Sequence, residues 1–352
     1  MATKNANLHN AKTAKNDEFY TQYEDIQNEM NAYLEYNPDV FRGKIILLPC
    51  DDPEWSNFTK FFAQHFEDFG LKKLISTSYA PVSKQINQPV SHFEQESPQF
   101  DKDKTNIKGK IFVLERDINN SGTIDIDDLE WQYLEGDGDF RSEEVKKLRD
   151  EADIIITNPP FSLYREFVAW IFEAGKQFSI IGNQNSITYK EIFSLLKGNK
   201  MWLGKGFTGM ATHFINKFYE DYATAGDHRE GMIRVSGVCW FTNLEHGKRH
   251  QPLQLMTMRE NKKFSKHKGI LEQGYPKYDN YNAIEVSFTD AIPSDYDGVM
   301  GVPITFLDKY NPEQFEILGM SASAGYNKNI VGIKLKLPGD ARPLINGENT
   351  FA

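Results

Sequence analysis

The sequence has little of what secreted, membrane and metal-binding proteins need. Its 352 residues include only two cysteines, Cys50 and Cys239, which lie far apart in apolar surroundings. They predict buried core thiols rather than a disulfide or a metal site. No apolar run approaches the roughly 20 residues that span a membrane, and the N-terminus lacks the apolar core of a signal peptide. We therefore expect a cytoplasmic protein with no membrane partner and no metal.

The sequence also lacks the net positive charge that is common in nucleic-acid-binding proteins, because its formal net charge is −10. The acidity is local: residues 115–153 contain fourteen acidic and five basic side chains and so account for −9 of this charge. Residues 248–277 instead contain eight basic and two acidic side chains, a local charge of +6. A solvated face is one interpretation of such a run. The other is contact with a phosphate backbone, for which the predicted residues are Lys248, Arg249, Arg259, Lys262, Lys263, Lys266 and Lys268.

Short apolar runs alternate with helix-forming segments over residues 44–242, after an amphipathic helical pattern at 11–36. The pattern predicts helices at 56–69, 142–151 and 162–174. It predicts strands at 44–48, 73–78, 110–115, 154–156, 178–181, 200–206 and 235–242. This alternation is typical of a doubly wound α/β sheet, which binds ligands at the carboxyl ends of its strands.

Residues 117–128 match the ligand spacing of a calcium-binding helix-loop-helix loop. Two features speak against calcium. Asp128 stands where the last ligand is usually Glu, and a predicted strand rather than a helix leads into the loop. We therefore expect a polar hairpin turn here.

The most informative stretch is Asn158-Pro159-Pro160-Phe161, which follows the apolar run 154–156. Two prolines fix two φ angles and remove two donors, so the strand ends and its last carbonyls point outward. The amine of a flat base can then donate to the Asn158 side chain and the Pro159 carbonyl, while Phe161 stacks on the base. The alternative is an ordinary strand-to-helix turn with an aromatic staple.

Three other loops carry ligand-capable side chains. Asp51 and Asp52 follow the first strand, where carboxylates can accept from ribose hydroxyls or cap the next helix. Asp139 can accept from a purine amine while Phe140 lies on the ring, or the loop can cap the helix that follows. The polar and aromatic residues 17–21 can fold over a ligand or pack on the body of the protein.

The chain contains, in this order, the stretches 16–21, 50–53 with 56–58, 136–141, 158–161 and 239–243. Together these five stretches resemble the EcoRI-type adenine-specific DNA methyltransferases. The Asn-Pro-Pro-Phe signature alone is shared with amino methyltransferases that act on RNA bases or on protein glutamine, so the order of the five is the more specific signal. The resemblance implies S-adenosylmethionine as methyl donor and a target adenine flipped out of the duplex. It also implies a Rossmann-like fold with a mixed, mainly parallel seven-stranded sheet.

The same resemblance assigns the site. The catalytic residues are Asn158, Pro159, Pro160 and Phe161. The cofactor-binding residues are Phe19, Tyr20, Thr21, Pro49, Cys50, Asp51, Asp52, Asp139, Phe140 and Asn158. Two departures affect the donor site: the glycine-rich first loop of most methyltransferases is absent, and residues 76–78 offer no acid for the ribose. Our hypothesis is that Asp51 or Asp52 takes that role.

These observations predict a catalytic domain over residues 1–245, with a surface insertion at about 80–135, and a target-recognition region over 246–352 that partly returns to the core. The predicted function is site-specific N6 methylation of adenine in double-stranded DNA, for restriction-modification or DNA marking. We expect a monomer, with any cognate restriction endonuclease acting separately. Two alternatives stay open, an amino methyltransferase acting on RNA or protein glutamine and a catalytically silent DNA- or partner-binding module.

Overall fold

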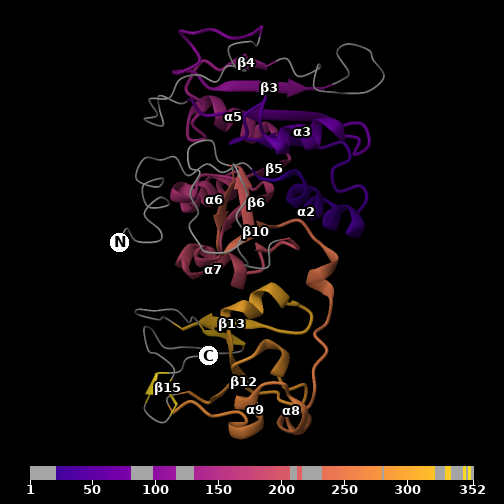
Figure 1. Ribbon diagram of the computed structural model, residues 1–352, viewed down its shortest axis with the longest axis vertical. Helices are drawn as coiled ribbons and strands as arrows, with labels where there is room; N and C mark the ends of the chain where they lie inside the picture. Colours follow the sequence, from indigo (N-terminus) through magenta and orange to yellow (C-terminus); the bar gives the residue numbers. More distant parts are fainter. Residues whose placement is uncertain are drawn as a thin grey trace. The chain divides into compact units, whose positions relative to one another are not determined.

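The computed structural model describes residues 21–80, 98–115, 131–206, 212–215, 232–279, 281–321, 330–333, 344–345 and 348–349. Phe19, Tyr20 and the calcium-like loop 117–128 lie outside these ranges. The chain divides into two compact units, which we describe separately (Figure 1). The first unit comprises residues 1–186 and 203–246, and the second comprises 187–202 and 247–352. No helix within the described ranges has the length and apolar character to cross a membrane.

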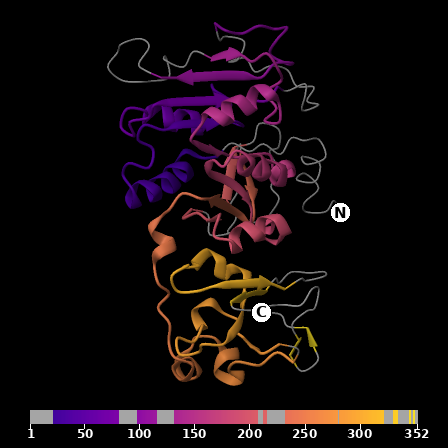
Figure 2. The ribbon, with the colours of Figure 1, turned by 180° about the vertical axis from the view of Figure 1, so that it is seen from behind.

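An eight-stranded sheet organises the first unit, with the order β4-β3-β2-β1-β5-β6-β10-β7. Its four central strands β2, β1, β5 and β6 are parallel, while β3, β4 and β10 pair antiparallel with their neighbours. Figure 2 shows the same strands from behind. The predicted mixed α/β sheet with a parallel centre is therefore present. The strands are β1 (Ile45–Leu48), β2 (Lys73–Thr77), β3 (Lys110–Leu114), β4 (Trp131–Tyr133), β5 (Ile154–Thr157), β6 (Gln177–Asn183), β7 (Trp202–Leu203) and β10 (Val238–Thr242).

Two strand predictions need correction. The sheet has eight strands in the described part of the chain rather than seven, because Trp131 is buried and pairs with Phe112, adding β4 at the edge. Strands β3 and β4 lie within residues 80–135, so part of the predicted surface insertion belongs to the sheet. The single strand predicted at 235–242 is interrupted at Gly237, whose φ of 67° separates β9 (Met232–Val235) from β10. β9 pairs instead with β8 (Thr212–Ile215).

Four α-helices accompany this sheet in the described residues: α2 (Tyr23–Tyr36), α3 (Asn57–Gln64), α5 (Glu143–Glu151) and α6 (Tyr164–Glu173). Helix α3 begins where the Ser56 hydroxyl accepts from the Phe58 amide at 3.0 Å. It ends earlier than the predicted residue 69, because residues 65–70 form turns that finish at Gly70 with a φ of 62°. The aromatic side chains of this segment still pack in the core, which is why the longer pattern resembled one helix.

The strand order reverses between β1 and β5. From β1 the chain passes through α3 to β2 on one side, and from β5 it passes through α6 to β6 on the other. Because such crossovers are right-handed, α3 and α6 cover opposite faces of the sheet, as a doubly wound fold requires. The carboxyl ends of β1 and β5 thus meet at the topological switch point, where open α/β sheets bind ligands.

The second unit has its own four-stranded sheet, in the order β11-β12-β14-β13. Its strands are β11 (Ala283–Glu285), β12 (Val299–Pro303), β13 (Ile317–Met320) and β14 (Ile330–Ile333), with a small pair β15 (Leu344–Ile345) and β16 (Glu348–Asn349). Its α-helices in the described ranges are α7 (Lys190–Lys197), α8 (Met258–Phe264) and α9 (Lys268–Gln273). Helix α8 starts at a capping box, in which Thr257 and Glu260 each accept from the backbone amide of the other.

In the described parts of both units, short 3-10 segments occur at Phe161–Leu163, Gln184–Thr188, Gly247–His250, Thr289–Ala291 and Ile304–Lys309.

Candidate active site

A pocket in the first unit joins three stretches that the sequence predicted separately, the end of β1, the loop before α5 and the loop after β5. Tyr79, Gly138, Arg141, Ser162 and Leu163 line it but were not predicted as site residues. No group of three or more His, Cys, Asp or Glu side chains within the described ranges could hold a metal ion. The complete lining is Pro49, Cys50, Tyr79, Gly138, Asp139, Phe140, Arg141, Pro160, Ser162 and Leu163.

The loop before α5 reaches this pocket because Gly138 packs directly on the end of β2. Gly138 has a φ of 80°, and a Cβ at this position would lie 2.1 Å from the Ser78 carbonyl oxygen. Only glycine fits so close an approach of two backbone segments. The Ala80 amide also donates to the Asp137 carbonyl at 2.8 Å. Tyr79 lies between these two contacts, and its position just after a predicted strand was the signal that could have identified it.

Arg141 holds the Asp139 carboxylate in one orientation. Its Nε donates to Oδ1 at 2.9 Å and its Nη2 donates to Oδ2 at 2.7 Å, a bidentate pair. The third guanidinium nitrogen, Nη1, donates to Glu166 Oε2 at 3.2 Å. The hydrogen bonds to Asp139, followed by the contacts with Glu166, raise the pKa of Arg141. The guanidinium therefore remains charged, and it orients the carboxylate of Asp139, a residue that lines the pocket.

The Phe140 ring forms a fixed apolar wall of the pocket. It is buried, and it contacts the rings of Phe167 and Trp170 on α6 with centroid distances of 5.1 and 5.6 Å. Both contacts are edge-to-face, the arrangement that aromatic quadrupoles favour. Phe140 is thus largely a core residue that also lines the pocket.

Strand β5 delivers Asn158, whose side chain is buried beside Thr21. Its Nδ2 donates to Thr21 Oγ1 at 3.4 Å, which directs the amide nitrogen toward Thr21 and the Oδ1 acceptor to the other side. Thr21 is held in turn, because its carbonyl accepts from Asn57 Nδ2 at 2.8 Å. Thr21 therefore joins the start of α2, the start of α3 and the end of β5.

The residues after Asn158 leave the sheet at once. Pro160 lines the pocket, and its carbonyl accepts from the Leu163 amide at 3.0 Å. Phe161 is half-buried and packs against the hydrophobic core of the unit. The loop is consequently supported on its core side, while its role toward a base stays a prediction.

The carboxylates of Asp51 and Asp52 are directed to protein groups. Asp51 is buried, and it accepts from Ser56 Oγ at 2.7 Å and from Thr157 Oγ1 at 2.6 Å. Asp52 Oδ1 accepts from the amides of the next turn, and its Oδ2 lies 3.6 Å from Lys110 Nζ. Neither residue lines the pocket, whereas Pro49 and Cys50 do. Cys50 is half-buried rather than a core thiol like Cys239, and neither cysteine forms a disulfide.

In the second unit, five of the predicted cations are exposed on and around α8 and α9. We call Arg259, Lys262, Lys263, Lys266 and Lys268 the basic face. An exposed aromatic ring accompanies them: Phe264 is 62% exposed, and Lys263 Nζ lies 4.8 Å from its centroid. Lys266 is paired with an acid, at 2.7 Å from Asp290. The arrangement presents positive charge and an aromatic ring together to solvent.

Two predicted cations do not share this exposure. Lys248 is ion-paired with Asp308 at 2.6 Å and is partly buried. Arg249 is only 4% exposed, because its guanidinium lies 3.6 Å from the Trp202 ring centroid and donates to Asn199. We therefore withdraw the prediction that Arg249 contacts a phosphate, since its charge is used inside the unit.

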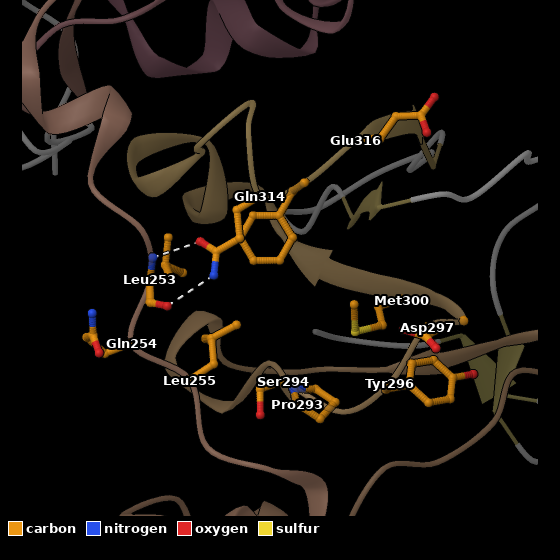
Figure 3. Close-up of a pocket in the computed structure, with 12 residues that line it drawn as sticks. Leu253, Gln254, Leu255, Pro293, Ser294, Tyr296, Asp297, Met300, Gln314 and Glu316 are labelled. Atoms are coloured by element: carbon orange, nitrogen blue, oxygen red, sulfur yellow. Dashed lines mark hydrogen bonds between the residues drawn. The ribbon is translucent and has the colours of Figure 1, made fainter.

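A groove of about 440 Å³ lies in the second unit between residues 253–255, 293–300 and 314–316 (Figure 3). The Gln314 side chain bonds the backbone of Leu253 twice, accepting from its amide at 2.8 Å and donating to its carbonyl at 3.1 Å. The segment then enters α8, where the Met258 amide donates to Asp295 Oδ1 at 2.7 Å. The groove is therefore fixed next to the first turn of the basic helix α8.

Comparison with known proteins adds an independent finding. A family model described as "Adenine-specific methyltransferase EcoRI" matches residues 7–345. The chain is 43% identical over 315 residues to type II methyltransferase M.EcoRI of Escherichia coli, with 88% of each chain covered. It is 35% identical over 318 residues to type II methyltransferase M.MpnI of Mycoplasma pneumoniae, with 89% of this chain and 85% of the relative covered. No solved structure matches it.

Proposed function

This chain belongs to the EcoRI family of adenine-specific methyltransferases, and on that premise we propose that it methylates adenine at a specific sequence in double-stranded DNA. The observation that carries the proposal is the convergence at the switch point. The Asn158 loop, the end of β1 and the Asp139 loop come from distant parts of the chain and meet around one pocket. We further propose that the eight-stranded sheet is the Rossmann-like methyltransferase fold with one added edge strand.

The lining of the pocket fits S-adenosylmethionine as methyl donor. Phe140, Pro160 and Leu163 offer apolar walls to a flat purine, and the oriented Asp139 carboxylate offers an acceptor for its amine. When bound, the donor supplies an electrophilic methyl group. Pro49 and Cys50 would border it, and Thr21 with Phe19 and Tyr20 would cover it. For the ribose, Asp52 is a better candidate than Asp51, whose two oxygens both accept from buried hydroxyls.

The Asn158 loop is suited to activate an exocyclic amine. The amine of adenine is a poor nucleophile because its lone pair is delocalised into the ring. Acceptance of its two hydrogens by Asn158 Oδ1 and the Pro159 carbonyl would favour tetrahedral geometry and stabilise the positive charge that develops on nitrogen. Phe161 would hold the flipped base by stacking on its face. The hydrogen bond from Asn158 Nδ2 to Thr21 Oγ1 supports this proposal, because it is made by the amide nitrogen and not by the oxygen that would accept from the base.

We propose that the first unit carries the chemistry and that the second unit, from residue 247 onward, reads the target. The basic face would contact phosphates, as would Lys248, which is partly buried and ion-paired with Asp308. The groove beside α8 presents the polar side chains of Gln254, Ser294 and Glu316, which are of the types that bind base edges. The enzyme would act as a monomer in restriction-modification or DNA marking, with any endonuclease acting separately.

Methyl transfer to several substrates in parallel tests this function. The purified chain is incubated with methyl-labelled S-adenosylmethionine and duplex DNA, RNA or protein, and genomic DNA from the same reaction is sequenced by a method that reads methylated adenine. We expect label in duplex DNA and methylation confined to one short sequence. If label appears only in RNA or in protein glutamine, the chain is an amino methyltransferase with that substrate. Absence of donor binding would favour a catalytically silent module.

A further inference from the structure

A buried carboxylate connects the two strands that meet at the switch point. Asp51, just after β1, is 5% exposed, and its Oδ2 accepts from Thr157 Oγ1 at 2.6 Å. Thr157 is fully buried and is the last residue of β5, directly before Asn158. Within the described residues, the last backbone pair between β1 and β5 is Leu47 with Ile155. The hydrogen bond between the Asp51 and Thr157 side chains therefore links the two segments beyond the point where their backbones pair.

Asp51 is itself held from three sides. Its second carboxylate oxygen accepts from Ser56 Oγ at 2.7 Å, its amide donates to the Thr77 carbonyl at 2.9 Å, and its carbonyl accepts from Ser76 Oγ at 2.6 Å. These partners belong to the ends of β2 and to the cap of α3. The carboxylate therefore has a fixed position relative to the sheet, and whatever it bonds is fixed with it.

Hydrogen bonds from hydroxyls to a buried carboxylate are short and strong, because the charge cannot be satisfied by water. Thr157 is β-branched and has few accessible rotamers, so the bond to Asp51 fixes its side chain and restricts its backbone. The next residue carries the acceptor oxygen of the Asn158 loop. A small rotation at Thr157 would move that oxygen relative to its target, which costs rate rather than binding.

We propose that Asp51 is a positioning residue for methyl transfer: through Thr157 it sets the direction of the Asn158 acceptor, and it is not a ligand of the donor ribose. This inference rests on the proposed function, because it assigns Asp51 to the acceptor side of the same site. It replaces the interpretation of Asp51 from the sequence, which placed the residue on the donor side. If Asp51 is a positioning residue, altering its carboxylate should lower kcat. If Asp51 is a ligand of the donor, the same change should raise the Kd of the donor.

The test compares Thr157→Val, Thr157→Ser, Asp51→Asn and the double variant Asp51→Asn with Thr157→Val. Valine has the shape of threonine without the hydroxyl, and serine keeps the hydroxyl. We expect Thr157→Val and Asp51→Asn to lower kcat by about ten- to a hundredfold. Donor affinity by calorimetry and KM for DNA should stay within about twofold of wild type. Thr157→Ser should retain most of the wild-type rate, because serine keeps the hydroxyl. The double variant should be no slower than the slower single variant, because both changes affect the same hydrogen bond.

Ser56→Ala is the matched control. It removes the hydrogen bond on the other oxygen of the same carboxylate and weakens the cap of α3, but it leaves the contact with Thr157. We expect a lower melting temperature and a fall in kcat that is smaller than for Thr157→Val, because the bonds of the Asp51 backbone to Thr77 and Ser76 still hold the residue. An equal fall in kcat for Ser56→Ala, or none for Thr157→Val, would overturn the proposal.

The donor-ligand assignment would instead be supported by a donor Kd that rises as much as kcat falls. If Asp51→Asn does not fold, the Thr157→Val and Thr157→Ser pair decides alone, because neither residue introduces a buried charge or a larger side chain. Hydrogen exchange of the peptide covering residues 155–164 provides a second measurement, and Thr157→Val should exchange faster there than Thr157→Ser. A wild-type enzyme without methyl transfer would refute the proposed function itself, which is a different outcome from an active wild type with an active Thr157→Val.

Discussion

The Asn158 loop of the first unit and the basic face of the second unit hold their polar groups in opposite ways. Asn158, Asp51 and Thr157 are buried, and each has a short or directed bond to another part of the fold. The cations of the basic face are exposed. Groups that stabilise a transition state must be oriented in advance and shielded from water, whereas contacts with phosphate displace mobile counterions and tolerate loose side chains. We therefore expect single changes to have large effects in the first region and small, additive effects in the second.

The largest effect is expected for Asn158→Ala, which removes the oriented acceptor. We expect kcat to fall by about a thousandfold or more, as for the loss of a preorganised hydrogen-bonding group in other active sites. Donor affinity, measured by calorimetry, should change little because the pocket lining remains. Asn158→Asp is the matched control, since it keeps an acceptor oxygen and should retain more activity. Single-turnover methylation of duplex DNA measures both, and turnover of Asn158→Ala near the wild-type rate would contradict the proposed mechanism.

The same contrast explains what the sequence could predict of the site. The Asn158 loop was predictable because its strand, its prolines and its acceptor are consecutive residues. Tyr79 and Arg141 were missed, although Tyr79 directly follows a predicted strand, because their place at the pocket depends on the approach of Gly138 to Ser78, a contact between distant segments. Arg249 shows the reverse error, since composition counts a charge but does not reveal that a tryptophan ring covers it.

The fold shows a similar division. The parallel centre of the sheet was predictable, because β1 and β5 are apolar on both faces and each is followed by a helix. The edge strand β4 was missed because it has only three residues, of which one is buried, too few to establish a period. The interruption at Gly237 was missed because Val235 and Val238 lie on either side of Ser236 and Gly237 and were read as parts of one apolar run. The positive φ of Gly237 separates the two strands.

A second prediction tests whether the donor side of the pocket depends on fixed groups as the acceptor side does. Arg141→Ala removes the bidentate partner that orients Asp139. We expect donor affinity to weaken by about tenfold, in line with the loss of a hydrogen bond to a charged group. Arg141→Lys should give an intermediate value, because a lysine supplies the charge without the planar fork. Calorimetry with S-adenosylmethionine measures both, and an unchanged Kd for Arg141→Ala would show that Asp139 needs no such support.

A third prediction concerns the basic face. Replacing Lys262, Lys263 and Lys268 with Gln should reduce the slope of log affinity against log salt concentration by about 0.9 for each phosphate that is no longer neutralised. Methyl transfer at saturating DNA should change little. Arg249→Gln is the contrasting control: because Arg249 is buried against Trp202, its replacement should lower the melting temperature and leave the salt slope unchanged. If Arg249→Gln changes the salt dependence of DNA affinity as much as replacement of one exposed lysine does, then the buried Arg249 contacts phosphate as the exposed cations do, and the prediction is wrong.

The smallest effect is expected for Asp290→Asn, at the pair that links Lys266 of the basic face to an acid. Burial of Asp290 opposes its ionisation, but its hydrogen bonds with Lys266 and His267 outweigh this, so the pKa of Asp290 is lowered. A carboxyl whose pKa is lower in the folded state stabilises the fold above its unfolded pKa of about 3.9, and this contribution is lost as the pH falls through the folded value. Since Asp290 and Lys266 are both well exposed, the contribution at neutral pH should be below about 1 kcal/mol.

The same substitution should slightly strengthen DNA binding, because it removes the negative charge beside Lys266 and leaves the basic face one charge more positive. We expect affinity at low salt to rise by about two- to threefold and this gain to disappear at high salt, where surface charges are screened. Unfolding by urea at neutral pH and binding titrations at two salt concentrations measure the two effects in one variant. A loss of DNA affinity in Asp290→Asn would indicate that the pair with Asp290 holds Lys266 in its binding position, so that even this exposed region would contain one preorganised cation.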